Sequence, residues 1–255
     1  MIVRRREEDQ SMNDRDVIDT FVAHLRDQGH TGLQVDRCPD EENRGSADID
    51  AIAGDFAIEH TSVDTLPNQR RDLDWFMRAA GNLEQELASP PAFRLSITLE
   101  YDAVGVGQNW TAVRAALTNW ITNEAPRLPE GRSLVENAPG IPFRLHVLKS
   151  SERRPGVFFA RFEPDDDTLP ARVRAAFDRK AEKLAKYQAS GITTILLVEN
   201  DDIALMNQGK MLEAIQTAFP AGLPSGVDEV WYADTSIRSA LEFRDFTPQL
   251  QKQKR

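Results

Sequence analysis

One stretch, ADIDAIAGDFAIEHTSVD at residues 47–64, constrains the fold of this chain more than any other. Two runs that alternate apolar and polar residues flank Gly54-Asp55, a dipeptide typical of a two-residue hairpin turn. Counting outward from that turn places Asp50 on one strand opposite Glu59 on the other. The sequence therefore predicts a hairpin that carries two directly opposed carboxylates.

The polar residues on one face of this hairpin need an explanation. Because side chains alternate along a strand, Asp48, Asp50, Glu59 and Thr61 share one face, and His60 points to the other. Opposed residues have Cβ atoms about 4.5–5.5 Å apart, where like charges are destabilising unless a positive group lies between them. A Mg²⁺ or Mn²⁺ ion held by Asp50 and Glu59 would be such a group. The alternative is an edge hairpin whose carboxylates are simply solvated.

Helical and strand patterns alternate along the rest of the chain. We predict helices at residues 14–28, 68–88, 110–124, 169–189 and 209–219. We predict strands on both sides of the hairpin turn and at residues 32–37, 93–101, 142–150, 156–162, 191–200 and 228–236. This alternation favours an α/β (α+β) fold in which helices flank a mixed central sheet.

Length and composition suit one globular domain. The chain has 255 residues, of which 40% are hydrophobic, enough for one substantial core. Four prolines mark a loop at 125–142 as the strongest candidate for an internal boundary, but we find no domain break and expect a single domain over 1–255. The net charge of −10 argues against a protein that coats nucleic acid non-specifically, although it leaves room for a local basic groove.

Cysteine usage and apolar runs bear on the compartment. The single cysteine, Cys38, excludes a disulfide framework and a cysteine-based zinc site. The basic N-terminus is not followed by an apolar segment, and no run approaches the roughly 18 apolar residues of a membrane span. We therefore expect a cytoplasmic protein with no membrane partner.

The predicted helix at 169–189 places a lysine in its apolar stripe. The stripe consists of Val173, Phe177, Leu184 and Tyr187. At about 100° per residue, Lys180 lies about 20° from Val173, whereas Lys183 lies at the edge of the stripe and Lys186 points away. A lysine in a buried stripe is costly unless it meets a carboxylate or a phosphate. The alternative is a lysine whose stem is buried while its ammonium stays in water.

The hairpin resembles the PD-(D/E)XK, or restriction-endonuclease-like, nuclease superfamily. That pattern is an Asp on one strand, a short turn, and Glu-x-Lys on the next strand. The resemblance covers residues 14–101, with 169–199 expected to pack on them, and implies a restriction-endonuclease-like core with a C-terminal elaboration. Asp50 resembles the metal-binding Asp of the family, with Asp48 as the alternative, and Glu59 resembles the Glu.

The resemblance departs from the family at one position. Thr61 stands where the lysine is expected, so the motif reads Glu59-His60-Thr61. Some members supply this lysine from a neighbouring helix, and Lys180 is the first candidate here, with Lys183 second. The resemblance then implies a nuclease that cleaves phosphodiester bonds with Mg²⁺ or Mn²⁺. If no lysine reaches the site, it implies an inactive module that binds nucleic acid or a protein partner.

Further contacts follow from the same resemblance. A carboxylate of the first helix sometimes joins the site, for which Asp16 and Asp19 are the candidates. Arg70 and Arg71 begin the helix after the hairpin, and with Lys183 they are candidates for contacting nucleic acid, although interleaved carboxylates also suit a solvated face. We expect DNA as the substrate, but the sequence itself does not choose between DNA and RNA. A homodimer is compatible with the resemblance.

Overall fold

The computed structural model describes residues 12–42, 48–202 and 204–251. Contacts divide the chain into two compact units. We call residues 1–67 with 167–255 the split unit and residues 68–166 the inserted unit. Each has a sheet and cores of its own, and each is described by itself. The expectation of a single domain over 1–255 stays a prediction, because compactness does not tell whether the units fold as one.

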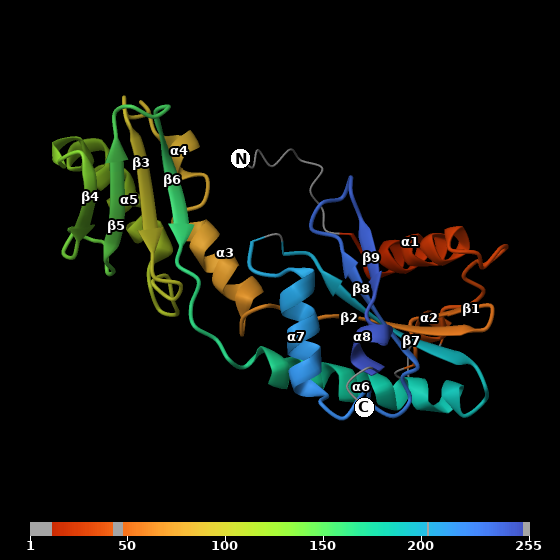
Figure 1. The fold of residues 1–255 in the computed structure, drawn as a ribbon. Coiled ribbons are helices and arrows are strands. Elements are labelled where there is room, and N and C mark those ends of the chain that lie inside the picture. The colour runs from red at the N-terminus through yellow and green to blue at the C-terminus, as the bar shows by residue number, and fades with distance from the viewer. Residues whose placement is uncertain (1–11, 43–47, 203, 252–255) are drawn as a thin grey trace. The chain divides into compact units, whose positions relative to one another are not determined.

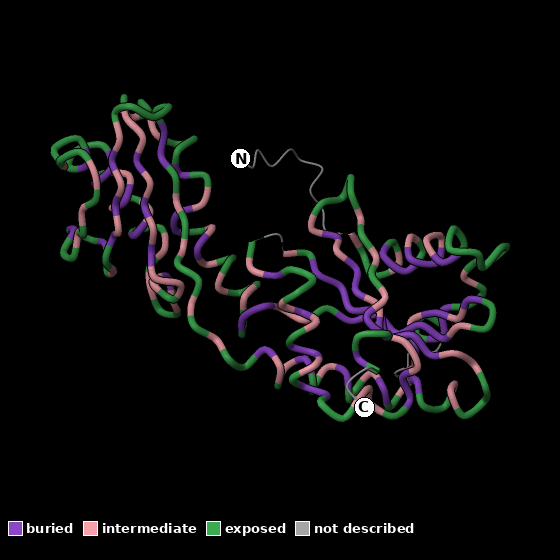
Figure 2. Tube along the Cα trace, viewed as in Figure 1, coloured by how far each residue is buried: buried purple, intermediate pink, exposed green. Residues whose placement is uncertain are grey.

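The split unit is built on a mixed sheet of five strands in the order β1-β2-β7-β8-β9 (Figure 1). The strands are β1 (Ala51–Ala53), β2 (Phe56–Ser62), β7 (Thr193–Asn200), β8 (Glu229–Asp234) and β9 (Glu242–Asp245). The three central strands run parallel, while β1 and β9 run antiparallel to their neighbours. Strands β2 and β7 are buried along most of their length (Figure 2).

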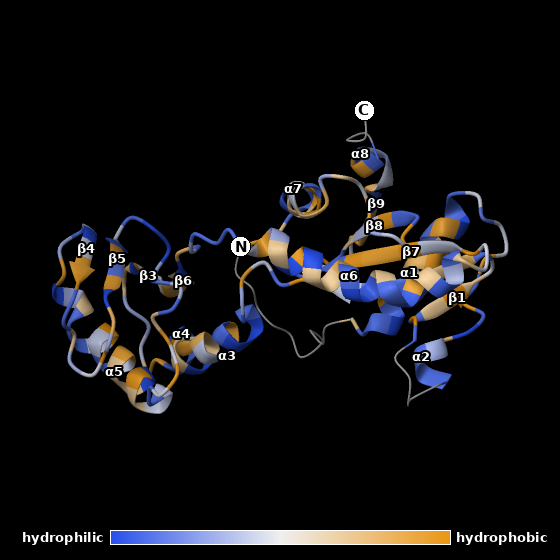
Figure 3. Ribbon diagram, turned by 90° about the horizontal axis from the view of Figure 1, so that it is seen from below, coloured by the Kyte–Doolittle hydropathy of each residue, from blue (hydrophilic) through white to orange (hydrophobic). Residues whose placement is uncertain are grey.

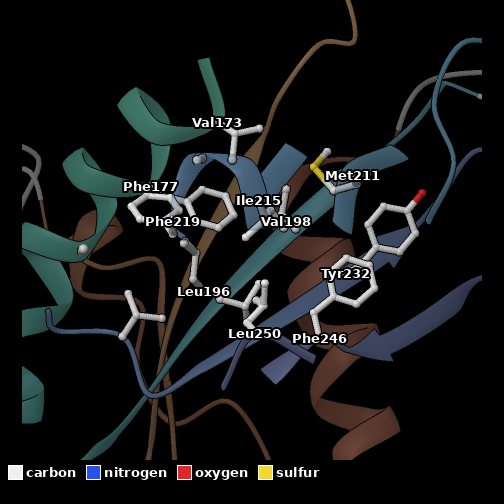
Figure 4. Close-up of a cluster of buried hydrophobic side chains, with 14 of the residues drawn as sticks. Val173, Phe177, Leu196, Val198, Met211, Ile215, Phe219, Tyr232, Phe246 and Leu250 are labelled. Carbon is white, nitrogen blue, oxygen red and sulfur yellow. The ribbon is translucent and has the colours of Figure 1, made fainter. Parts of the chain in front are cut away.

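Helices cover both faces of this sheet. They are α1 (Asp14–Asp27), α2 (Pro39–Glu42), α6 (Leu169–Gln188), α7 (Gln208–Ala218) and α8 (Thr247–Gln251). Helix α1 packs its apolar stripe on residues such as Ile58 and Leu197. Helices α6 and α7 pack on the opposite face, where Phe177 stacks on Phe219 at 5.8 Å between ring centroids (Figure 4). The strand face that carries Glu59 is therefore the face beneath α6.

The sequence signals at the helix ends and the hairpin turn explain this local structure. Asn13 caps α1 by accepting a hydrogen bond from the backbone N–H of Asp16, as the prediction of a helix at 14–28 requires. The hairpin has the predicted register, in which Ala51 pairs with Ile58. Gly54 adopts φ +53°, and a Cβ there would lie 3.0 Å from Leu33 Cδ1, so glycine suits this turn on two counts.

The inserted unit has a second mixed sheet, in the order β4-β5-β3-β6. Its strands are β3 (Arg94–Leu99), β4 (Gly131–Val135), β5 (Leu145–Ser150) and β6 (Gly156–Arg161). Its helices are α3 (Gln69–Ala79), α4 (Leu83–Glu86), α5 (Trp110–Asn123) and the 3₁₀ turn η1 (Ala125–Arg127). The α-helices lie on one side of the sheet, where they enclose its core (Figure 3). The α/β (α+β) class with mixed sheets flanked by helices is thus confirmed.

Several predicted elements need correction. Residues 32–37 form no strand but only one bridge, Arg37 to Ile52, beside β1. The helix predicted at 68–88 breaks around Gly81 and Asn82, where Asn82 has a left-handed φ of 56°. The proline-rich stretch 125–142 contains η1 and β4 rather than a continuous loop. Strand β9 and helix α8 follow the last predicted strand.

The residues expected to form one core, 14–101, are divided between the two sheets. The strand predicted at 93–101 lies in the sheet of the inserted unit, so residues 14–101 do not form one continuous core. Residues 169–199 supply α6 and β7 instead, and β7 pairs in parallel with β2. The unit that carries the acidic hairpin is therefore completed by a distant part of the chain.

Among the described helices, none combines the length and apolar character needed to cross a membrane.

We predict that Phe177→Ala lowers the free energy of unfolding by about 3–5 kcal/mol, because Phe177 is fully buried between α6 and the sheet. Urea unfolding followed by circular dichroism would measure this change. Leu134→Ala is the control, since Leu134 is 50% exposed. A loss below about 1 kcal/mol for Phe177→Ala would contradict the packing described here.

Candidate active site on the hairpin and helix α6

Glu59 lies at the centre of the site. It sits in the middle of β2, between β1 and β7, and is 0% exposed. Because Ala51 pairs with Ile58, the next pair along the hairpin brings Asp50 opposite Glu59, as predicted. A fully buried carboxylate is costly unless positive groups or hydrogen bonds compensate its charge.

Helix α6 supplies that compensation. Lys180 and Lys183 both donate a hydrogen bond to the same oxygen, Glu59 Oε1, and the bond from Lys183 is 2.9 Å long. Lys183 also donates to the backbone carbonyl of Asp48 at 2.7 Å. The side chains of Lys180 and Lys183 are 15% and 20% exposed, so these ion pairs are largely shielded from water. Lys180 thus meets a carboxylate, one of the two kinds of partner expected for a lysine in an apolar stripe.

The two aspartates are held differently. Asp50 Oδ2 accepts a hydrogen bond of 2.6 Å from the backbone N–H of His60 and lies 3.9 Å from Lys180 Nζ. Asp48 Oδ1 accepts hydrogen bonds from Lys186 Nζ at 2.7 Å and from the hydroxyl of Tyr187 at 2.9 Å. The carboxylates of Asp48, Asp50 and Glu59 thus all face one side of α6, with a lysine close to each.

Burial and charge act in opposite directions on these groups. Burial raises the pKa of Glu59 and the Asp50 carboxylate raises it further, while the hydrogen bonds from Lys180 and Lys183 act against this shift. Burial, the largest single effect, disfavours the charged form of Lys183, but the hydrogen bond to Glu59 and the charges of Glu59, Asp50 and Asp40 together outweigh it and raise the pKa of that ammonium. The charged form of Glu59 therefore depends on the two lysines that reach it.

The two carboxylate oxygens of Glu59 differ in their hydrogen bonding. Among the described residues, none donates a hydrogen bond to Glu59 Oε2, although this atom is buried. Most buried polar atoms in folded proteins have a partner, so an exception points to a missing one. An ionised carboxylate oxygen can only accept, from a donor or a cation, and Lys180 and Lys183 both bond the other oxygen. The arrangement leaves Glu59 with one oxygen available for an added cation, beside Asp50.

A second polar group lies on the opposite face of the same strand. His60 Nε2 is 3.0 Å from Glu199 Oε2, and His60 Nδ1 is 3.7 Å from Asp14 Oδ1. Within the described part of the chain, Asp14, His60 and Glu199 are close enough together to hold a metal ion, with ligand atoms within 4.8 Å of one another. Thr235 donates a 2.5 Å hydrogen bond to the other oxygen of Glu199. Both oxygens of Glu199 therefore have partners, unlike Glu59 Oε2.

The remaining predicted residues lie outside the cluster of contacts around Glu59. Thr61 is buried on β2, on the face that Glu59 shares. Asp19 pairs with Arg15 on the exposed side of α1. Arg70 and Arg71 belong to the inserted unit, where the guanidinium of Arg71 pairs with Asp72 and lies over the ring of Trp75. Asp16 takes part in the start of α1, where its carbonyl accepts from Thr20.

Some participants were missed from the sequence. Lys186 points away from the apolar stripe, yet its ammonium lies 2.7 Å from Asp48 Oδ1. Tyr187 belongs to the predicted apolar stripe, yet its hydroxyl donates a hydrogen bond to Asp48, and burial together with that carboxylate raises the pKa of Tyr187 to about 12. No local signal links His60 to Glu199, 139 residues away.

Comparisons with known proteins name no relative. Neither protein-family models, nor curated proteins, nor solved structures gave a match to this chain. The chemistry of the site must therefore be inferred from its own residues.

We predict that Glu59 and Lys180 are energetically coupled. Glu59→Gln should destabilise the fold by about 3 kcal/mol, because it leaves buried lysines without their counter-charge. In a double-mutant cycle with Lys180→Met, the interaction energy should be about 1 kcal/mol or more. Urea unfolding of the wild type, both single variants and the double variant measures it. Additive effects of the two substitutions would show that the pair does not form.

Proposed function

We propose that the split unit is a Mg²⁺- or Mn²⁺-dependent phosphodiesterase that cleaves nucleic acid. The observation that carries this proposal is the unsatisfied Glu59 Oε2, buried on a strand whose cross-strand neighbour is Asp50 and whose other oxygen accepts from Lys180. Metal-assisted phosphodiester hydrolysis can use such a group, in which two neighbouring carboxylates hold the metal ion and a lysine lies beside them. The resemblance of this hairpin to restriction-endonuclease-like nucleases agrees with that chemistry.

The donor atoms fit the expected ion. Mg²⁺ and Mn²⁺ prefer carboxylate oxygens and retain waters, so two carboxylates are sufficient protein ligands. Asp50 and Glu59 would hold the ion, with Asp48 as the further carboxylate of the same face. When bound, the ion would lower the pKa of a coordinated water and offset the negative charge of a phosphate.

The lysines would then serve the substrate. Lys180 lies within 3.9 Å of Asp50 and donates to Glu59, so its ammonium stands between both proposed ligands. A cation in this position stabilises negative charge that develops on a phosphate and orients a nearby water. Lys183 is anchored to the Asp48 carbonyl and is the second candidate for this role, or for binding the nucleic-acid backbone. We expect DNA as the substrate, and a reducing cytoplasm suits a chain with one cysteine.

A second candidate function has its own supporting observation. The carboxylates of Asp48, Asp50 and Glu59 each lie near a lysine of α6, so the site is close to charge balance without any metal. Such a network suits an inactive module of the same fold that binds nucleic acid or a protein partner. A homodimer, and contacts of Arg70 and Arg71 with nucleic acid, stay predictions under either function.

The test separates binding of the metal from cleavage. We expect isothermal titration to show that the wild type binds Mn²⁺ and that Asp50→Asn and Glu59→Gln abolish this binding. Lys180→Met should keep the metal but lower the rate of cleavage of an unstructured oligonucleotide by about 10²–10³-fold, because it removes an electrostatic stabiliser. Asp55→Asn is the matched control, since Asp55 is an exposed carboxylate in the turn of the same hairpin.

Two results would overturn this proposal. If the wild type binds no Mn²⁺ while remaining folded, the cluster is an internal ion network. If it binds Mn²⁺ but cleaves neither DNA nor RNA, the inactive-module alternative holds.

A further inference from the structure

One face of the sheet of the inserted unit is left open by the helices of that unit, all of which are described. The other face is filled by alternate residues of the strands, such as Leu95 and Val147, which pack under the helices of this unit. The outward residues form no part of that core, and Figure 3 shows the α-helices on one side only. Phe158 and Phe162, on and just after β6, are 38% and 42% exposed. Exposed aromatic rings on an open sheet face indicate a binding surface.

The strand register places the outward side chains in rows. Arg132 pairs with Leu148, which lies opposite Ser96, and Ser96 lies opposite Phe158. One row across the four strands therefore reads arginine, leucine, serine, phenylalanine. The neighbouring row begins with Leu134 and continues through His146, Thr98 and Ala160. At about 4.8 Å between strands, each row is about 14 Å long.

A groove follows these rows. Its volume is about 490 Å³, and its lining includes Thr98, Arg132, His146, Leu148 and Phe162. The rings of His146 and Phe162, which both line the groove, meet edge to face with their centroids 4.9 Å apart. The groove therefore offers flat apolar rings, hydroxyl groups and one cation within a short distance.

The charge of this face is positive. All residues of the inserted unit are described, and none of the outward residues within its four strands is an acid. Arg132 is exposed and forms no ion pair with any described residue, while Arg94 lies 4.3 Å over the ring of Phe158. Glu100, at the end of β3, is already paired with Arg144 at 3.7 Å and with His146 at 3.2 Å. The face suits an anionic ligand that also presents flat rings.

We propose that this open face binds single-stranded nucleic acid, with bases stacked on Phe158 and Phe162 and a phosphate on Arg132. Four-stranded sheets that carry aromatic residues on an open face stack two or three unpaired bases in this manner. Aromatic rings and arginine planes accept any base, so the surface selects for strandedness rather than sequence. A duplex keeps its bases stacked on one another and offers the rings no partner.

The position of the inserted unit in the chain gives this face a role, and this inference rests on the proposed function. The unit lies between residue 67 and residue 167, after the strand that carries Glu59 and before the helix that carries Lys180. Two covalent connections tie it to the split unit, so binding of a strand on the sheet raises the effective concentration of that strand for the split unit. The substrate class that follows is single-stranded DNA or RNA.

The test measures binding without cleavage. Fluorescence anisotropy would be recorded for labelled 12-nucleotide DNA and RNA strands, and for the matching duplexes, mixed with the full chain. The strands are several times longer than the two or three bases expected to stack, and a chelator removes divalent metal so that no cleavage occurs. We expect single strands to bind at least about ten-fold more tightly than duplexes. Phe162→Ala and Phe158→Ala should each weaken binding about ten-fold, and Arg132→Gln should reduce the salt dependence by about one phosphate contact.

Controls keep this inference separate from the proposed function. Val106→Ala changes a 79% exposed apolar residue outside the sheet and should leave binding unchanged. Glu59→Gln should also bind single strands normally, and binding without any metal-dependent cleavage would support the sheet proposal while refuting the nuclease. Comparison of the DNA and RNA strands shows which nucleic acid is preferred.

Three outcomes would overturn the sheet proposal. The first is equal affinity for single strands and duplexes. The second is unchanged affinity for single strands in Phe158→Ala and Phe162→Ala variants that remain folded. The third is self-association that Phe162→Ala abolishes, with no oligonucleotide bound, which would assign the face to a second copy of this chain.

Discussion

The ion pairing of a fully buried carboxylate organises the split unit. Glu59 lies in the middle of a strand whose neighbours on both sides exclude water, and its charge is tolerated because Lys180 and Lys183 of α6 reach it. An apolar residue at position 59 would suit the core without any such requirement. Ion pairs as well as apolar packing therefore hold the hairpin against α6. In the same arrangement Asp50 lies close to Lys180 and Asp48 lies close to Lys186.

The two faces of β2 carry different chemistry. On the side of α6, Glu59 retains an unsatisfied oxygen and its partners are partly accessible to water. On the side of α1, the ring of His60 lies between Glu199 and Asp14, and both Glu199 oxygens are bonded. A satisfied cluster ties strands and helix together, whereas an unsatisfied one has capacity for a ligand. That difference is why we place the chemistry beneath α6.

Local signals predicted the elements that depend on local geometry. A two-residue turn at Gly54-Asp55 sets the register of its strands, so the opposition of Asp50 and Glu59 follows from the sequence. The angle of Lys180 on a regular helix likewise follows from its spacing to Val173. The identity of its partner does not, because Lys180 and Glu59 lie 121 residues apart. The sheet to which β3 belongs does not follow either, since β3 has the same apolar alternation whichever sheet it joins.

The most direct measurement is anomalous diffraction from crystals grown or soaked with Mn²⁺, recorded at the manganese absorption edge. We predict a peak that contacts Glu59 Oε2 and Asp50, with Lys180 beside it. Glu59→Gln crystals should lack this peak. A peak only among Asp14, His60 and Glu199 would contradict the account, because it would move the metal to the other face of the sheet. No peak at either place would leave the lysine and carboxylate cluster as a purely internal ion network.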